Sequence, residues 1–147
     1  MTALLVGAEP VVDVTSGYPH RTLLASAESL LALAGAAGAV QLWEGTYAPP
    51  VDDIAPLGLR SWRLPAVWLF ASVAVPSATA AVLLYRRSPS APTAVLVASG
   101  LLATELAVQI PFVGPSGLQA AFGSVSAGLA GLGLHARRTG WRPKGDA

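Results

Sequence analysis

The sequence predicts an all-α membrane protein, a four-helix transmembrane bundle with an extracytoplasmic cap between the first and second helices. Charged residues make up only 12% of the 147 positions and hydrophobic residues 53%, with a mean hydropathy of +0.57. A soluble domain of this size could not bury so much apolar surface. The apolar residues fall into four separate runs, and basic residues gather at one set of their ends. These observations predict a single domain with lipid as its solvent.

The four apolar runs have the length of membrane-spanning helices. They cover residues 22–42, 64–85, 93–110 and 117–136. Each is about 18 to 22 residues long, close to the ~20 residues that carry a helix across about 30 Å of hydrocarbon. None of them alternates apolar and polar residues as the strands of a membrane barrel do. Short proline-containing breaks separate the last three runs, so we expect antiparallel neighbouring helices.

The first run has a competing interpretation as a signal peptide cleaved after the small residues Ala37-Gly38-Ala39. That run is longer than the apolar core of a typical signal peptide, and it contains an acidic residue, Glu28. A retained first helix is therefore the favoured interpretation.

The longest connection, residues 43–63, is the predicted cap. It carries aromatic residues of the type that lie at the level of the lipid headgroups, namely Trp43, Tyr47 and Trp62. It also contains three prolines and Gly58, which disfavour a long helix. We expect an ordered segment that lies on the membrane surface.

Pro76 falls in the middle of the second run. Because proline has no N–H, it should kink this helix, with Ser72, Ser77 and Thr79 available to satisfy the freed backbone groups.

Small residues recur at four-residue spacing in two of the predicted helices. The fourth has Gly123, Ala127 and Gly131, and the first has Ala34 and Gly38. Such stripes let helices approach closely in lipid. The favoured interpretation is packing within one chain, and the alternative is the face of a homodimer.

The basic residues predict the orientation. One side of the predicted bundle holds seven of them: Arg21, Arg86, Arg87, Arg137, Arg138, Arg142 and Lys144. The other side holds two, Arg60 and Arg63. Because Lys and Arg near span ends favour the cytoplasmic side, both termini are predicted to be cytoplasmic in a multi-pass protein of the plasma membrane.

Glu28 and Glu105 are the charged residues that lie well inside the predicted spans. Such groups are expensive in lipid, so they face a cavity or a partner. Helical rise places the two at depths that differ by about 10 Å, which makes a direct carboxyl pair improbable. Glu28 could serve a proton-coupled transporter, or be an inert acid bonded to Ser26, Ser29 or backbone.

A polar, outward-facing pocket is predicted around Glu105. Gln109 shares its helix face, and Gln119 and Gln41 lie near the same outer level of the fourth and first runs. A small headgroup, a cation or a proton could bind there. The competing structural interpretation pairs Glu105 with Arg60 or Arg63, in a network of cap ion pairs that also contains Asp52, Asp53 and Glu44.

Several classes of function have no support in the sequence. The absence of cysteine excludes disulfides, thiolate metal sites and thiol redox chemistry. No histidine lies near the outer pocket to activate a serine, and His20 and His135 at the inner boundary do not form a haem pair between facing helices. No phosphate-binding loop and no continuous basic face for nucleic acid is present. We therefore expect no catalytic residues, metal or cofactor.

The layout resembles the small DoxX-like membrane proteins of bacteria: four helices in under 150 residues, a longer first outer connection and arginine-flanked ends, from Arg21 to Arg138. The resemblance implies a non-catalytic module, such as an accessory subunit or a lipid- or quinone-binding protein, with a membrane protein partner or a homodimer as possible assemblies. The alternative is a small proton-coupled transporter, since small multidrug transporters also have four spans and a glutamate in the first. A catalytic role for Glu105 with Asp52 or Asp53 is the third hypothesis.

Overall fold

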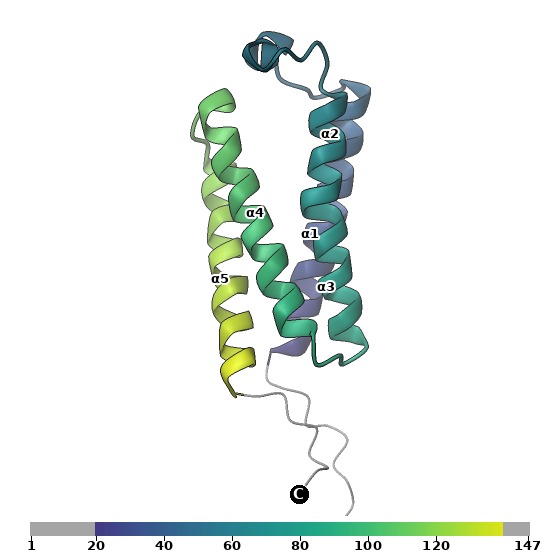
Figure 1. Ribbon diagram of the computed structural model, residues 1–147, viewed down its shortest axis with the longest axis vertical. Coiled ribbons are helices and arrows are strands. Elements are labelled where there is room, and N and C mark those ends of the chain that lie inside the picture. Colours follow the sequence, from purple (N-terminus) through teal and green to yellow (C-terminus); the bar gives the residue numbers. More distant parts are fainter. Residues whose placement is uncertain (1–19, 140–147) are drawn as a thin grey trace, which may run out of the picture.

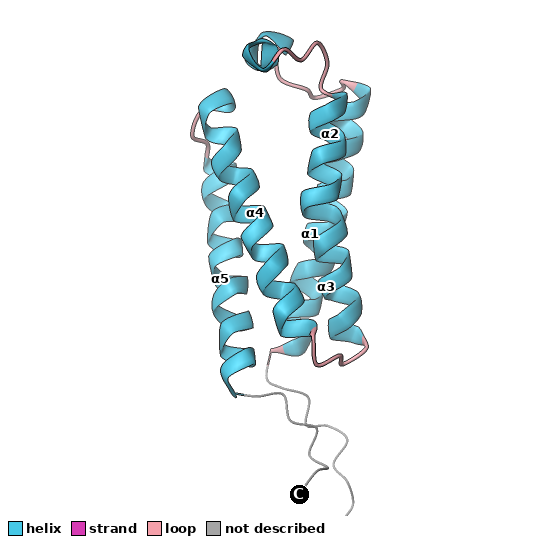
Figure 2. Ribbon diagram, viewed as in Figure 1, coloured by secondary structure: helices cyan, strands magenta, loops and turns pink. Residues whose placement is uncertain are grey.

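The computed structural model describes residues 20–139, and all regular secondary structure in this part of the chain is helical (Figures 1 and 2). The elements are α1 (Arg21–Glu44), the 3-10 helix η1 (Val51–Leu57), α2 (Arg63–Leu69), the π-helical segment η2 (Phe70–Ala74), α3 (Val75–Tyr85), α4 (Ala91–Val113) and α5 (Gly117–Thr139). The predicted all-α fold class is confirmed. Two residues used to predict the orientation, Arg142 and Lys144, lie outside the described residues.

Four helical stretches are long and apolar enough to cross a membrane: Arg21–Glu44, Arg63–Tyr85, Ala91–Val113 and Gly117–Thr139. Each contains one of the four predicted spans. The third is longer than predicted because Pro111 lies in the last turn of α4 and does not end it, and Gly114 N–H still bonds to the carbonyl of Ile110 at 2.9 Å. Large side chains such as Leu30 and Leu33 are two-thirds exposed, as expected of helices that face lipid.

The helices pack in two pairs that α4 joins. Helix α1 packs against α2, η2 and α3, and α5 packs against α4, while α4 contacts η2 and α3. Leucine, valine and alanine side chains from α1, α3 and α4 form the buried core, to which α5 contributes Leu129. Figure 1 shows the outer ends of α2 and α4 diverging, with η1 lying above them. This divergence positions the candidate site.

The second span contains a π-helical turn, η2, directly before α3, in which Pro76 is the second residue. The N–H of Val75 bonds to the carbonyl of Phe70, five residues back. Hydroxyl groups bond to further carbonyls, from Ser72 Oγ to Trp68 at 2.8 Å and from Thr79 Oγ1 to Val75 at 2.8 Å. A widened turn of this kind accommodates a residue that cannot donate a hydrogen bond.

Close approach between helices depends on two glycines, Gly35 and Gly133. A Cβ atom on Gly35 would lie 3.1 Å from the backbone nitrogen of Ala74, and one on Gly133 would lie 3.3 Å from the side chain of Leu96. Gly38 also packs as predicted, against Leu69. Most of the stripe predicted on α5 does not pack against other described residues: Ala127 and Gly131 are exposed, and no atom lies within 4 Å of a Cβ built on Gly131. A Cβ on Gly123, by contrast, would lie 4.0 Å from the side chain of Leu106.

Replacement of Gly35 by leucine should therefore destabilise the fold, because backbone atoms of η2 cannot move aside. We expect Gly35→Leu to lower the free energy of unfolding by about 1–3 kcal/mol, measured by denaturant titration of purified protein in mild detergent. Gly128→Leu is the matched control: it lies on α5 in open space, so its effect should stay within about 0.5 kcal/mol. Equal losses in the two variants would contradict this packing.

The orientation can be tested by single-cysteine labelling, because the native chain has no cysteine. Ser61, between η1 and α2, and Ser90, before α4, are both exposed and lie at opposite ends of the bundle. With the basic end in the cytoplasm, a membrane-impermeant maleimide should label Ser61→Cys on intact cells and Ser90→Cys only after permeabilisation. Labelling of Ser90→Cys on intact cells would refute the predicted sidedness.

Candidate functional site

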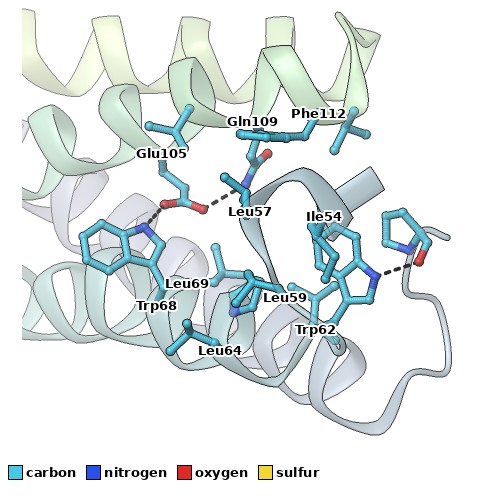
Figure 3. A pocket seen from close by; sticks show the side chains of 15 residues that line it. Ile54, Leu57, Leu59, Trp62, Leu64, Trp68, Leu69, Glu105, Gln109 and Phe112 are labelled. Atoms are coloured by element: carbon cyan, nitrogen blue, oxygen red, sulfur yellow. Dashed lines mark hydrogen bonds between the residues drawn. The ribbon is translucent and has the colours of Figure 1, made fainter. Parts of the chain in front are cut away.

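Glu105 lies at the junction of the two helix pairs, and its carboxyl accepts hydrogen bonds from three side chains, of which Figure 3 shows Trp68 and Gln109. Trp68 Nε1 donates to Oε2 at 2.6 Å, and Gln109 Nε2 donates to Oε1 at 3.1 Å. The hydroxyl of Ser72 lies 3.3 Å from Oε2, although its single proton is also directed to the Trp68 carbonyl at 2.8 Å. Glu105 is only 8% exposed, so these bonds replace its solvation.

Helical spacing explains how the sequence builds this cluster. Glu105 and Gln109 are four residues apart on α4, and Trp68 and Ser72 are four residues apart on α2 and η2. Residues at this spacing share one helix face. Two such faces meet where α4 crosses η2, so the side chains of Gln109, Trp68 and Ser72 converge on the Glu105 carboxyl.

A cavity of about 560 Å³ opens on the outer side of Glu105, between α2, α4 and the cap. We call it the outer pocket. Its lining is apolar or aromatic except for the carboxyl of Glu105 and the amide of Gln109. The lining residues are Leu42, Pro49, Ile54, Leu57, Leu59, Trp62, Leu64, Pro65, Trp68, Leu69, Glu105, Val108, Gln109, Phe112 and Val113. The pocket therefore combines a large apolar surface with a single acidic group on its wall (Figure 3).

The cap supplies the roof of the outer pocket. Ile54 of η1 is 2% exposed, and Trp62 Nε1 donates to the carbonyl of Pro49 at 2.7 Å, which holds the two ends of the cap together. Gly45 and Gly58 end α1 and η1 with φ of 75° and 71°. Because side chains rarely adopt this left-handed conformation, these two glycines permit the sharp turns of the cap.

Two of the predicted pocket residues serve helix ends instead. Gln119 Oε1 accepts the N–H of Ser116 at 3.0 Å while Ser116 Oγ accepts the N–H of Gln119 at 3.2 Å, a capping box at the start of α5. Gln41 has an exposed side chain, and its carbonyl accepts the N–H groups of Gly45 and Thr46. Neither lines the outer pocket, which is apolar where the sequence predicted a polar site.

The cap ion pairs predicted from the sequence are not formed. Within residues 20–139, no nitrogen of Arg60 or Arg63 lies within 4.0 Å of a carboxylate oxygen of Glu44, Asp52, Asp53 or Glu105. The guanidinium of Arg63 instead lies over the ring of Trp43, 5.5 Å from its centroid, in a cation–π contact. Glu105 accepts a hydrogen bond from Trp68 and pairs with neither Arg60 nor Arg63.

Trp68 is the functional-site residue that the sequence interpretation missed. Its indole N–H is a donor that needs a partner when it lies below the headgroup region. Its position about one turn inside the second span, at the outer level of Glu105, was the available signal.

Glu28 forms a second, separate acidic position in the core. Its side chain is 0% exposed, and neither carboxyl oxygen has a hydrogen-bond partner among the described residues. The buried hydroxyl of Ser77 on α3 lies beside it. Glu28 does not line the outer pocket, so the two intramembrane carboxyls occupy different environments.

The described part of the chain brings together no group of three His, Asp or Glu residues that could hold a metal ion. The lining of the outer pocket offers hydrogen bonding by Glu105 and Gln109 together with apolar contact.

Comparisons of the chain with protein-family models, with curated proteins and with solved structures find no match. The resemblance to DoxX-like proteins consequently stays a prediction from layout, and the geometry of the site is the basis for assigning a function.

The bond between Trp68 and Glu105 should contribute measurably to stability. Trp68→Phe keeps the ring but removes the N–H, which leaves a buried acceptor short of one donor, so we expect a loss of about 1–3 kcal/mol in the free energy of unfolding. Trp43→Phe is the control, because Trp43 is half exposed and donates no hydrogen bond. If the two variants unfold at the same denaturant concentration, the bond is not stabilising.

Proposed function

We propose that this protein is a non-catalytic integral membrane module that binds an amphipathic, lipid-phase molecule in the outer pocket. The observation that carries the proposal is the carboxyl of Glu105 in the wall of an otherwise apolar cavity of about 560 Å³. Small-molecule sites are typically about 300–1,000 Å³ in volume, mostly apolar, and contain a few polar groups that fix the orientation of the ligand.

The donors on Glu105 define the chemistry of the ligand. Each carboxyl oxygen can accept two hydrogen bonds. Trp68 and Ser72 occupy both positions on Oε2, and Gln109 occupies one on Oε1. The remaining position on Oε1 accepts a hydrogen bond, so the ligand must present a donor: a hydroxyl, a quinol or an ammonium headgroup. The surrounding leucines, phenylalanine and proline fit an apolar body attached to that group.

The rim of the outer pocket favours access from the bilayer. Leu57, Leu64 and Val108 line the pocket and are each more than half exposed. An apolar rim is compatible with acyl chains and disfavours water-soluble ligands. The excess of arginine at the opposite end of the bundle supports a pocket on the extracytoplasmic side of a plasma membrane, with cytoplasmic termini.

An accessory role beside a membrane protein partner, or as a homodimer, is consistent with this proposal. The exposed face of α5 around Ala127 and Gly131 is free of contacts within the described chain. A DoxX-like module that presents a lipid or quinol to a partner would need both a pocket and such a face.

The proposal is tested by native mass spectrometry of protein purified in mild detergent. We expect a co-purifying lipid or quinol at a 1:1 ratio in the wild type. Leu59→Trp should fill the pocket and abolish the adduct, whereas Leu118→Trp, an exposed position on α5 away from the pocket, should retain it. Glu105→Gln keeps an oxygen for Trp68 but offers fewer acceptors to the ligand, so occupancy should fall roughly tenfold.

Bare protein in every wild-type preparation would refute ligand binding. An adduct that survives Leu59→Trp as well as Leu118→Trp would place the bound molecule outside the outer pocket.

A further inference from the structure

Glu28 is the buried polar group that lipid binding in the outer pocket does not use. The side chain is completely enclosed, and its two oxygens lack hydrogen-bond partners within the described residues. A charged carboxylate without a partner is costly in such surroundings, whereas a carboxyl that carries a proton avoids most of this cost. A position that serves only packing would be more stable with leucine or methionine.

The helix that faces Glu28 also reaches the outer pocket. Ser77 lies beside Glu28, and Ser72, five residues earlier in the same helical stretch, lies 3.3 Å from Glu105 Oε2. Five residues rise about 7.5 Å along a helix. The π-helical turn and Pro76 interrupt the regular backbone hydrogen bonding within this interval, and π-bulges occur frequently at functional positions.

We propose that the protein translocates protons, with Glu105 as the entrance in the outer pocket and Glu28 as the proton-binding site in the core. A proton from the outer side binds the carboxylate of Glu105 and then passes to an oxygen of ionised Glu28, so Glu105 returns to a carboxylate and Glu28 becomes a carboxylic acid. Glu28 then releases the proton to the cytoplasm and becomes ionised again. The hydroxyls of Ser72 and Ser77 relay the proton, and water molecules must enter the interval of about 7.5 Å between them. No electron transfer is involved, and the transmembrane potential supplies the driving force.

The inner side of Glu28 is closed in this structure. Leu24 and Leu84 are both 0% exposed, and Arg21 Nη1 donates to the carbonyl of Leu84 at 3.2 Å at the inner end of α1 and α3. A site that translocates must be closed toward one side in each state. Because Glu28 is 0% exposed and does not line the outer pocket, the structure corresponds to an occluded state, closed toward both sides.

The charged groups around Glu28 provide no ion-pair partner for its ionised form. On its own helix, Arg21 is about two turns away and is bonded to Leu84. On the packed elements α2, η2 and α3, the titratable residues are Arg63 and Tyr85, at the two ends of the second span, and the polar neighbour of Glu28 is Ser77. An ionised Glu28 thus has no ion-pair partner within the described core.

The experiment measures proton flux into proteoliposomes that hold the full chain, with a pH-sensitive dye inside and a potassium diffusion potential set by valinomycin. Wild-type vesicles should acidify several-fold faster than protein-free vesicles. Glu28→Gln and Glu105→Gln should each lower the protein-dependent rate at least tenfold. Glu44→Gln is the matched control, an exposed position at the outer end of α1, and should leave the rate unchanged.

Wild-type flux equal to that of protein-free vesicles would overturn the proposal, as would full flux in Glu28→Gln. Full flux in Glu105→Gln would overturn the assignment of the entrance. None of these three outcomes bears on co-purification of a lipid, so the proton-translocation proposal and the lipid-binding proposal can fail independently.

Two further measurements guard against a folding defect. Glu28→Asp keeps an ionisable group and should show a rate between those of the wild type and Glu28→Gln. Dicyclohexylcarbodiimide reacts with proton-carrying carboxyls in apolar surroundings, so it should modify Glu28 of the wild-type protein, located by mass spectrometry, and abolish flux in parallel. Unmodified Glu28 in the wild type, or equal loss of flux in Glu28→Asp and Glu28→Gln, would count against the proton site.

Discussion

The hydrogen-bonded contact between α4 and the outer half of the second span holds this fold together. Lipid provides no hydrophobic driving force between helices, so association depends on close packing and interhelical hydrogen bonds. Glu105 on α4 accepts the indole N–H of Trp68, which links the α1–α3 pair to the α4–α5 pair. The buried core lies on the inner side of this contact, and the outer pocket opens beyond it. The outer pocket and the core thus lie on opposite sides of this hydrogen bond.

The outline of the fold could be predicted because few solutions exist in lipid. Backbone groups must pair internally, so apolar runs of the right length are helices. Glu105 and Gln109 were predicted together because four-residue spacing fixes a common face, independent of tertiary detail. The prediction that Gln41 and Gln119 line the outer pocket was wrong for a local reason. Helix ends leave unpaired backbone groups, and these bond to the Gln119 side chain and to the Gln41 carbonyl. The partner of Glu105 depended on how two helices cross, which periodicity does not encode.

The cap shows the same limit. Opposite charges in one connection favoured ion pairs, yet Arg63 lies over Trp43 and the apolar residues of η1 turn toward the pocket. Exposed ion pairs contribute little free energy, whereas burial of a side chain such as Ile54 contributes about 1.5–3 kcal/mol. Apolar burial therefore decided the conformation of the cap. The charged side chains of the cap face solvent and headgroups instead of each other. Their closeness in the sequence does not reveal this.

The peripheral position of helix α5 has a consequence for how the protein assembles during synthesis. It packs against α4 and contributes Leu129 to the core, while the shared interior of α1, α3 and α4 is built from residues that precede it in the chain. During synthesis the first three spans can therefore acquire their mutual contacts before the last one leaves the ribosome. The final helix then joins a preformed surface on α4 as the second half of a hairpin, so assembly can proceed in chain order without rearrangement of earlier contacts.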